Sequence, residues 1–259
     1  MTKFFRWISL LLIVSSLSGC FYWIRVYQTY LQMDEFEENF SITSSDVFNL
    51  NFNNPKLSSK DFTSLLKVQP SSKSSTADKQ WRYLFKKIDK NWHVVEPEIS
   101  FYFDLSFNSK EQLKQWTLSS LFLHIAPPEF LEVSIRSIAG AEIHKDTRQL
   151  KANTDLIEKI STDLPKKKHI LSQLGDPIEI KDQEENEIYL YHFLLDTEHI
   201  EEGYEDRALS KIELTFDKKT NEIIKMSGRF VGLKISIRYR NYLVEKQDKL
   251  ASTLKGKKK

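Results

Sequence analysis

Two parts of this 259-residue chain resemble each other, and this internal similarity constrains the fold more than any other feature of the sequence. The matching segments are residues 81–85 and 189–193, residues 105–108 and 214–217, and, further downstream, residues 121–123 and 231–233. Pro177, Tyr191 and Phe216 are separated by 14 and then 25 residues. Pro70, Tyr83 and Phe107 are separated by 13 and then 24 residues, so the two sets of intervals agree within one residue. Two unrelated antiparallel meanders would also show similar alternation of apolar and polar residues. Three anchors at matching intervals nevertheless favour a duplication, and an internal repeat determines the fold class.

The repeat predicts an α+β fold of two tandem units, residues 58–125 and 165–240, joined by connecting helices in residues 126–164. Each unit would have one or two helices packed on one face of a three- to four-stranded antiparallel meander sheet. The clearest strand is residues 99–107, where apolar and polar side chains alternate. The other expected elements are helices at 23–40, 127–139, 153–163 and 166–174, strands at 48–52, 187–195, 209–216 and 222–239 with a bend at Gly228, and a polar loop at 69–80.

The first 19 residues have the pattern of a bacterial signal peptide, with Lys3 and Arg6 ahead of an apolar stretch and small residues. Leu17-Ser18-Gly19-Cys20 resembles the lipobox of bacterial lipoproteins, which makes Cys20 the expected lipidation site and mature N-terminus. Each buried CH₂ of an acyl chain contributes about 0.8 kcal/mol, so more than one chain anchors a protein stably. The alternative is an uncleaved transmembrane helix over residues 7–24.

Residues 20–57 are predicted to form a lipid-anchored N-terminal helix and a short strand. Aromatic side chains gather at the start of this segment: Phe21, Tyr22, Trp23, Tyr27 and Tyr30. Such rings suit the bilayer interface, where they lie at the level of the headgroups. The alternative is a helix packed on the sheet of the first unit.

Charge and cysteine content exclude several classes of function. Lys3 and Arg6 supply the whole net charge of +2, so the part after residue 19 is neutral, which argues against general nucleic-acid binding. Since Cys20 is the single cysteine, no disulfide or cysteine-ligated metal site can form within the chain. The basic tail, residues 241–259, ends in lysines that could contact anionic lipids or could simply be a soluble end.

Catalytic motifs are absent from the sequence, which contains no GxSxG, Walker loop or GxGxxG pattern. The six histidines are scattered, and His199-Ile200-Glu201-Glu202 is interpreted as a solvated acidic loop rather than a metal site. His192, on a strand face with apolar neighbours, is interpreted as a hydrogen-bonded core or edge residue. Glu96 and Glu98 flank Pro97 in a loop. We therefore predict no catalytic residue, no metal and no cofactor.

The C-terminal unit resembles the SmpA/OmlA family, the BamE-like lipoproteins of the outer-membrane β-barrel assembly machinery. The residues that carry the resemblance are Ile170, Leu174-Gly175-Asp176-Pro177, Tyr189-x-Tyr191 and Leu214-x-Phe216-Asp217. Leu164-Pro165-Lys166 stands where that family has Gly-Met-Thr. The resemblance implies a helix packed on an antiparallel sheet and a role in outer-membrane assembly or maintenance. Phe21 after the cysteine, instead of Asp, resembles the pattern of lipoproteins sorted to the outer membrane.

We therefore expect a non-enzymatic lipoprotein on the periplasmic face of the outer membrane that binds another envelope protein. A second hypothesis is a carrier of a lipid or other apolar ligand, with a pocket lined by Phe101, Phe103, Leu105 and Phe107. A third is a hydrolase whose site the sequence does not show. Neither the partner nor the oligomeric state follows from the sequence.

Overall fold

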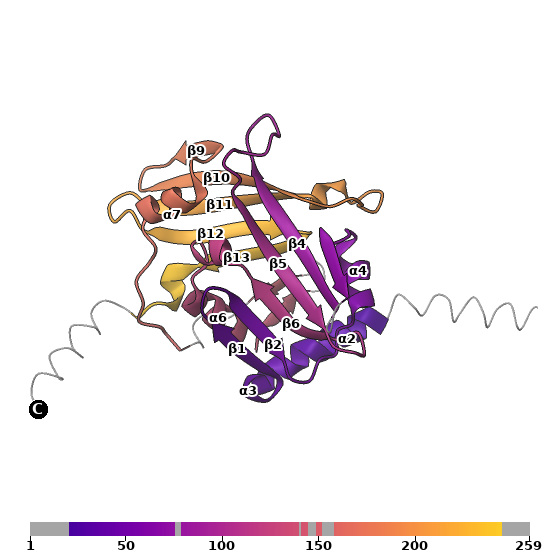
Figure 1. Ribbon diagram of the computed structural model, residues 1–259. Coiled ribbons are helices and arrows are strands. Elements are labelled where there is room, and N and C mark those ends of the chain that lie inside the picture. The colour runs from indigo at the N-terminus through magenta and orange to yellow at the C-terminus, as the bar shows by residue number, and fades with distance from the viewer. Residues whose placement is uncertain (1–20, 76–78, 140, 145–148, 152–157, 245–259) are drawn as a thin grey trace, which may run out of the picture.

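The structure is a computed structural model that describes residues 21–75, 79–139, 141–144, 149–151 and 158–244. Its strands form one antiparallel 11-stranded sheet, curled into a half-barrel, and a separate two-stranded ribbon, β7–β8 (Figure 1). The strands are β1 (Phe40–Ser44), β2 (Phe48–Phe52), β3 (Ser72–Ser75), β4 (Lys79–Ile88), β5 (Ser100–Phe107), β6 (Leu113–Leu118), β7 (Glu142–His144), β8 (Gln149–Lys151), β9 (Glu179–Asp182), β10 (Asn186–Leu195), β11 (Leu209–Asp217), β12 (Ile223–Phe230) and β13 (Leu233–Arg238). The α+β class with a mainly antiparallel sheet is confirmed.

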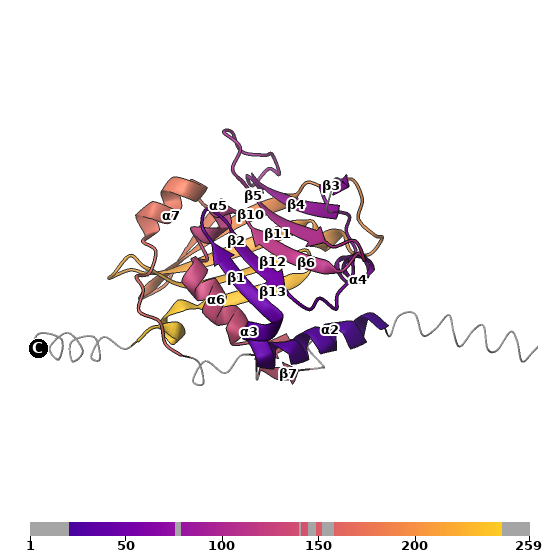
Figure 2. The same cartoon turned by 60° about the horizontal axis from the view of Figure 1, so that its bottom comes forward.

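The path through the large sheet is β1-β2-β6-β5-β4-β10-β11-β12-β13, and β3 and β9 pair with β4 and β10 beside this path. The helices of the described residues are α2 (Phe21–Leu31), η1 (Gln32–Glu35), α3 (Phe36–Asn39), α4 (Ser59–Leu66), α5 (Ser120–Leu123), α6 (Pro128–Arg136), α7 (Lys167–Leu174), η3 (Glu205–Arg207) and η4 (Tyr239–Tyr242). Figure 2 shows α2 along the lower edge of the molecule, next to α3 and below the strands of the large sheet.

The same series of elements occurs twice along the chain. Residues 58–118, here called the first segment, contain a helix, a short strand and three longer strands in the order α4-β3-β4-β5-β6. Residues 166–230, the second segment, contain α7-β9-β10-β11-β12 in the same order. In both segments each strand pairs with the next one along the chain.

Strand register also agrees between the two segments. Phe107 lies opposite Lys79 on β4, and Phe216 lies opposite Glu187 on β10. A shift in register interrupts the next strand pair at Ser106/Phe107 in the first segment and at Thr215/Phe216 in the second. The ring at each of these phenylalanines makes an edge contact with an aromatic ring on the preceding long strand, at centroid distances of 5.0 Å (Trp81–Phe107) and 5.1 Å (Tyr189–Phe216).

The two segments share one sheet, because β4 of the first pairs antiparallel with β10 of the second over residues 85–88 and 192–195. Lys86 faces Leu194 at the centre of this pairing, and Phe193–Lys87 and Leu195–Phe85 flank it on either side. The prediction of a separate sheet for each unit is therefore wrong. Free strand edges attract other strands, and here each segment covers part of the other's edge.

Each segment also caps the helix of the other. Lys87, on β4, donates from Nζ to the carbonyl oxygens of Leu174 and Asp176, both at 2.6 Å, at the end of α7. Arg207 donates from Nη1 to the carbonyl oxygens of Leu65 and Leu66, at 2.6 and 2.7 Å, at the end of α4. Carbonyls in the last turn of a helix lack partners within the helix and favour a nearby positive charge. These two contacts join the segments into one body.

The core lies on the inner face of the curled sheet, where aromatic rings from five elements meet. The ring of Phe101 contacts those of Phe122 on α5, Phe193 on β10 and Phe230 on β12, at centroid distances of 5.6, 4.9 and 5.8 Å. Burial of this kind stabilises the fold by about 25 cal/mol for each Å² of apolar surface removed from water. The chain after β6 turns inward as α5 to supply Phe122, whereas the chain after β12 turns into β13. The predicted match between residues 121–123 and 231–233 is therefore wrong.

Most predicted elements are present, with three corrections. The polar segment 69–80, predicted as a loop, contains β3 and the start of β4. The helix predicted at 153–163 lies partly outside the described residues; its described part, 158–163, is not helical, and Ile160 forms a bridge with Leu243. The bend predicted at Gly228 lies instead at Val231 and Gly232, both with positive φ, where β12 turns into β13.

Candidate functional site: the exposed face of the N-terminal helix

The first described helix, α2, has one face on the protein and one in solvent. Its sequence, FYWIRVYQTYL, contains a single charged residue, Arg25. The structure therefore agrees in part with the interpretation that this helix packs on the body. The opposite face retains the aromatic character that suggested a bilayer interface.

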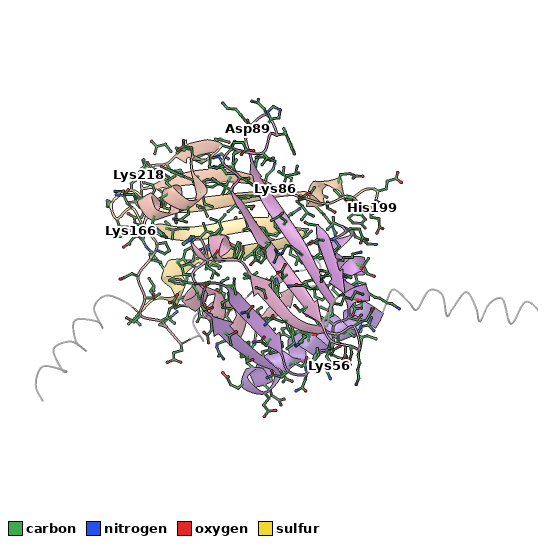
Figure 3. All side chains as sticks on the ribbon, in the orientation of Figure 1. Lys56, Lys86, Asp89, Lys166, His199 and Lys218 are labelled. Atoms are coloured by element: carbon green, nitrogen blue, oxygen red, sulfur yellow. The ribbon has the colours of Figure 1, made fainter. Side chains whose placement is uncertain are left out.

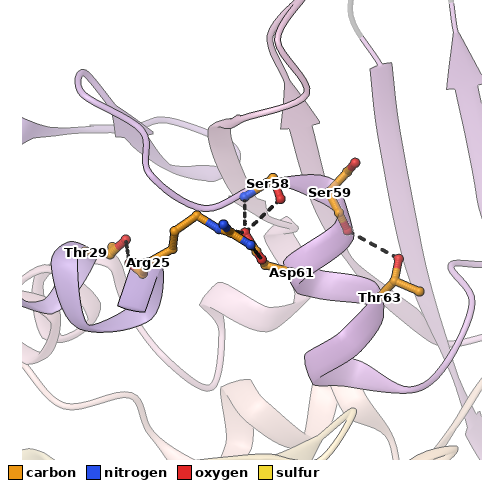
Figure 4. Close-up of polar contacts among 6 residues, drawn as sticks. All are labelled: Arg25, Thr29, Ser58, Ser59, Asp61 and Thr63. Carbon is orange, nitrogen blue, oxygen red and sulfur yellow. Dashed lines mark hydrogen bonds and ion pairs between the residues drawn. The ribbon is translucent and has the colours of Figure 1, made fainter. Parts of the chain in front are cut away.

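The packed face is held by an ion pair at the start of α4. The guanidinium of Arg25 donates two hydrogen bonds to the carboxylate of Asp61, one of them 2.7 Å long from Nε to Oδ2 (Figure 4). Asp61 also accepts from the backbone N–H and the hydroxyl of Ser58, at 2.7 and 2.8 Å, and the bond from the backbone N–H belongs to the capping box of α4. One carboxylate thus caps α4 and binds α2.

Asp61 is 3% exposed, and burial alone would raise the pKa of its carboxyl. The hydrogen bonds from Arg25 and Ser58 outweigh burial and hold that pKa below its usual range. The carboxylate therefore stays charged at neutral pH, as the ion pair requires.

Of two further contacts, the first lies within α2 and the second orients the helix on the protein. The hydroxyl of Thr29, which is buried, donates to the carbonyl oxygen of Arg25 at 2.9 Å. The hydroxyl of Tyr30 donates to the carbonyl oxygen of Ala141 at 2.8 Å, next to the β7–β8 ribbon. Tyr30, one of the five aromatic residues noted in the sequence, thus faces the protein.

The solvent face of α2 is largely apolar, although the polar side chain of Gln28 is also exposed. Trp23, Tyr27 and Leu31 follow one another at intervals of four residues, with exposed fractions of 43, 53 and 47%, and Ile24 beside them is 50% exposed. Residues four apart lie on one face of a helix, so these side chains form a continuous apolar stripe. Within the described part of the chain, the large exposed apolar side chains outside α2 are Trp92, Val94, Ile180 and Leu233. The apolar surface is therefore concentrated on α2.

Cys20, the predicted lipidation site, lies outside the described residues, as do the predicted signal peptide and the lysines at the C-terminus. Cys20 immediately precedes α2 in the chain. None of the helices in the described ranges combines the length and apolar character needed to cross a bilayer.

The acidic loop 199–202 is tied to the first segment. A carboxylate of this loop, that of Glu201, accepts from Nζ of Lys67 at 2.9 and 3.0 Å, and the carbonyl oxygen of His199 accepts from the backbone N–H of Gln69 at 3.0 Å. Among the residues that the structure describes, no group of three or more histidine, cysteine, aspartate or glutamate side chains is placed to bind a metal.

His192 differs from its prediction. Its Nε2 is buried and has no hydrogen-bond partner within the described residues, whereas the sequence suggested a hydrogen-bonded ring. Burial, and then the charge of Lys211, lower the pKa of this imidazole. The ring is therefore neutral at neutral pH.

The two carboxylates flanking Pro97 lie in the loop between β4 and β5. The Glu96–Pro97 peptide bond is cis, and the carboxylate of Glu98 is 3.7 Å from Nζ of Lys86. Lys86 is itself 2.9 Å from Asp196. This small surface network links the loops that follow β4 and β10.

The structure brings together two histidines that appeared scattered in the sequence. Nε2 of His169 lies 3.1 Å from Nδ1 of His124, although the two residues are 45 positions apart. Burial, and then the neighbouring imidazole, lower the pKa of His124. No local pattern could have revealed this pair, because it depends on the packing of α5 against α7.

No protein-family model, curated protein or solved structure matches the chain. The arguments that follow therefore depend on the residues and their geometry.

Proposed function

We propose that this chain is a non-enzymatic lipoprotein of the bacterial envelope, anchored on the periplasmic face of the outer membrane through Cys20, where it binds another envelope protein. The observation that carries the proposal is the exposed apolar stripe of α2, which begins next to the predicted lipidation site. Contiguous exposed apolar surface marks a place where a protein meets a membrane or a partner.

The bilayer is the occupant that the position of the stripe favours. A helix rises about 1.5 Å per residue, so Trp23 would lie only about 5 Å along the axis from a lipidated Cys20. Acyl chains at that residue would bring the stripe to the headgroup region, where Trp and Tyr rings are favoured. An amphipathic helix in the plane of the interface adds its buried apolar area to the strength of the anchor.

A stripe bound to the membrane would also orient the rest of the protein. Arg25 and Asp61 fix α2 to α4, so the half-barrel would take a defined orientation to the bilayer rather than hang from a flexible tether. Figure 3 shows Asp89, at the end of β4, on the side of the molecule away from Lys56, which precedes α4. The loop after β4 would then face the periplasm, where a protein partner can reach it.

We further propose that the two segments are copies of one ancestral unit. The matching strand register, the register shift at the same position and the equivalent ring contacts support a duplication. The resemblance of the second copy to the SmpA/OmlA family makes outer-membrane assembly or maintenance the process that we propose for the partner.

The carrier hypothesis receives less support. Phe101, Phe103, Leu105 and Phe107, which were expected to line a ligand pocket, are all buried. Their neighbours are other side chains: Phe103 contacts Phe122 at 5.2 Å between ring centroids, and Phe107 contacts Trp81 at 5.0 Å. Side chains from the sheet and helices thus occupy the positions that a ligand would need.

The decisive experiment places Trp23 and Trp92, the two tryptophans that are exposed among the described residues, relative to the bilayer. The mature protein, which begins at Cys20 and so lacks Trp7, is reconstituted into phosphatidylethanolamine–phosphatidylglycerol vesicles that contain brominated acyl chains, which quench tryptophan fluorescence on contact. We expect quenching of the wild type to be largely lost in Trp23→Phe and retained in Trp92→Phe. Trp92 is the matched control because it is 58% exposed and its backbone N–H bonds to Asp89, on the other side of the molecule. Equal quenching in both variants would contradict the membrane-bound stripe.

Lipidation and partner binding are tested separately. An alkyne fatty acid fed to cells should label the wild type and leave Cys20→Ser unlabelled. Affinity purification from detergent-solubilised envelopes should then recover a specific envelope protein with the wild-type chain. Labelling of both proteins would remove the anchor from the proposal, and the absence of any recovered envelope protein would remove the partner.

A further inference from the structure

We propose that His124 and His169 form a binding site for a divalent transition-metal ion, with Cu(II) bound most strongly. His124 caps the C-terminal end of α5, and His169 lies on the first turns of α7. The site therefore joins the chain that follows the first segment to the helix that begins the second. It is independent of membrane anchoring and of the proposed partner.

The distance between the two ring nitrogens suits a shared metal ion. Imidazole nitrogens bind such ions at about 2.0–2.1 Å, so two of them at an angle of about 95–110° lie about 3.0–3.4 Å apart. Nδ1 of His124 and Nε2 of His169 are 3.1 Å apart.

The orientation of the rings agrees with this distance. The ring centroids are 4.9 Å apart and the ring planes meet at 73°. A straight N–H···N hydrogen bond of the same length would place the centroids about 5.4 Å apart. The shorter separation means that at least one of the two nitrogens is angled toward a point beside the line that joins them, where a metal ion would lie.

Buried neighbours hold both backbones in place. Phe122 and Ile125, on either side of His124, are 0 and 1% exposed. Next to His169, Ile170 is 0% exposed and anchors α7 in the core. Ligands on backbone held by packing lose little freedom when a metal binds, which favours binding.

The donor atoms select the class of metal. Neutral imidazole suits copper, zinc and nickel, whereas calcium and magnesium require oxygen ligands. Affinity at a nitrogen site follows the order in which Cu(II) exceeds Ni(II) and Zn(II). With two protein ligands, water would complete the coordination and leave positions open to exchange.

The test uses full-length protein in detergent, carrying no histidine tag, with Cu(II) added at one equivalent. Pulsed electron paramagnetic resonance distinguishes coordination by one imidazole from coordination by two. We expect two imidazoles in the wild type and one or none in His124→Asn and His169→Asn, with Cu(II) affinity reduced about tenfold or more in each variant. Both rings are at the surface, so circular dichroism should show folded variants.

His199→Asn is the matched control, because His199 is also exposed and lies beside the carboxylates of the acidic loop. This variant should retain the wild-type spectrum and affinity. A wild-type spectrum with fewer than two imidazoles would overturn the proposal, as would full Cu(II) affinity in His124→Asn and His169→Asn. Loss of the two-imidazole signal in His199→Asn would overturn it as well.

Discussion

The first segment, residues 58–118, and the second, residues 166–230, share a strand plan but differ in their polar contacts. In the first, the helix ends at Lys67, which has a positive φ. The carbonyl oxygens of the two residues before it, Leu65 and Leu66, accept hydrogen bonds from Arg207. In the second, the helix ends at Gly175, also with a positive φ, and the carbonyl of Leu174 accepts from Lys87. Lys87 is 5% exposed and Arg207 is half-buried. Thus two similar helix ends are capped by different cations in different surroundings.

This comparison teaches that two segments can share the arrangement of their apolar side chains while their polar contacts differ. Large side chains at equivalent strand positions face one core and must fit it. A buried polar group, by contrast, needs only a hydrogen-bond partner, and that partner can come from any part of the chain. The four predictions below separate these two kinds of position.

The largest effect is expected at the equivalent phenylalanines Phe107 and Phe216. Each ring is fully buried, so either substitution to Ala should lower the free energy of unfolding by about 3–5 kcal/mol. Lys211→Ala, on the exposed face of β11, should cost about 0.5 kcal/mol or less. Urea melts of the full chain measure all three, because β10 pairs with β4 and the second segment should not be tested alone. A large loss in only one of the phenylalanine variants would show that the two positions are not equivalent.

A smaller effect is expected at the helix caps. Lys87→Met leaves two carbonyl groups without their donor in a buried place and should cost about 1–3 kcal/mol. Arg207→Met removes a half-buried cap, where water can replace the guanidinium, and should cost less. Burial lowers the pKa of Lys87, so the folded protein releases this proton at a lower pH than the unfolded chain does, and the stability of the wild type relative to Lys87→Met should rise between pH 7 and pH 10. Chemical melts at pH 7 and pH 10 test the order and the pH dependence. Equal losses in both variants would contradict the comparison.

The equivalent tyrosines should differ more subtly. The hydroxyl of Tyr191 donates to the carbonyl oxygen of Gly175 at 3.2 Å, whereas the hydroxyl of Tyr83 is buried without a partner in the described part of the chain. Tyr191→Phe should therefore cost about 0.5–1.5 kcal/mol, and Tyr83→Phe should be neutral or stabilising. Thermal unfolding by calorimetry measures both. If Tyr83→Phe is the more destabilising, its hydroxyl has a partner that the geometry does not reveal.

The smallest effect is expected at the turns that follow β5 and β11. Asn108 and Asp217 each accept hydrogen bonds from backbone N–H groups of their turn, but only Asp217 titrates. The hydrogen bond from Arg240, followed by that from the backbone N–H of Thr220, lowers the pKa of Asp217 to about 2. A carboxyl whose pKa is lowered by folding stabilises the protein above its unfolded pKa, near 4, and loses that contribution as the pH falls toward 2.

We therefore expect Asp217→Asn to reduce the loss of stability between pH 4 and pH 2, while costing less than about 1 kcal/mol at pH 7, as for other surface ion pairs. Asn108→Asp is the matched variant in the first segment. Urea melts across the acid range compare both variants with the wild type. An unchanged acid transition in Asp217→Asn would show that this carboxyl does not contribute.

Local patterns predicted the strands that alternate strongly. In residues 99–107, a period of two leaves no other way to bury one face, and β5 is present. The polar sequence of β3, SKSS, has no such pattern, and this segment is a strand because it pairs with the edge of β4. The described end of the helix predicted at 153–163 is extended because Ile160 pairs with Leu243. Of the candidate site, the sequence revealed the aromatic residues of α2 but not which of them face solvent.

By itself, the sequence determined which side chains of the strongly alternating strands, β5 and β11, face the core, and that the spacing of the strands repeats. Both follow from short-range periodicity, which the chain carries locally. Only the tertiary structure decided that β4 pairs with β10 to form one sheet and that His124 meets His169. It also decided that Lys87 caps α7 and that Arg207 caps α4. The pairing of β4 with β10 and the two helix caps depend on backbone groups at strand edges and helix ends. Because nearly every residue carries the same backbone groups, the sequence does not mark these contacts. The histidine pair requires two distant turns to be brought together, so no local pattern marks it.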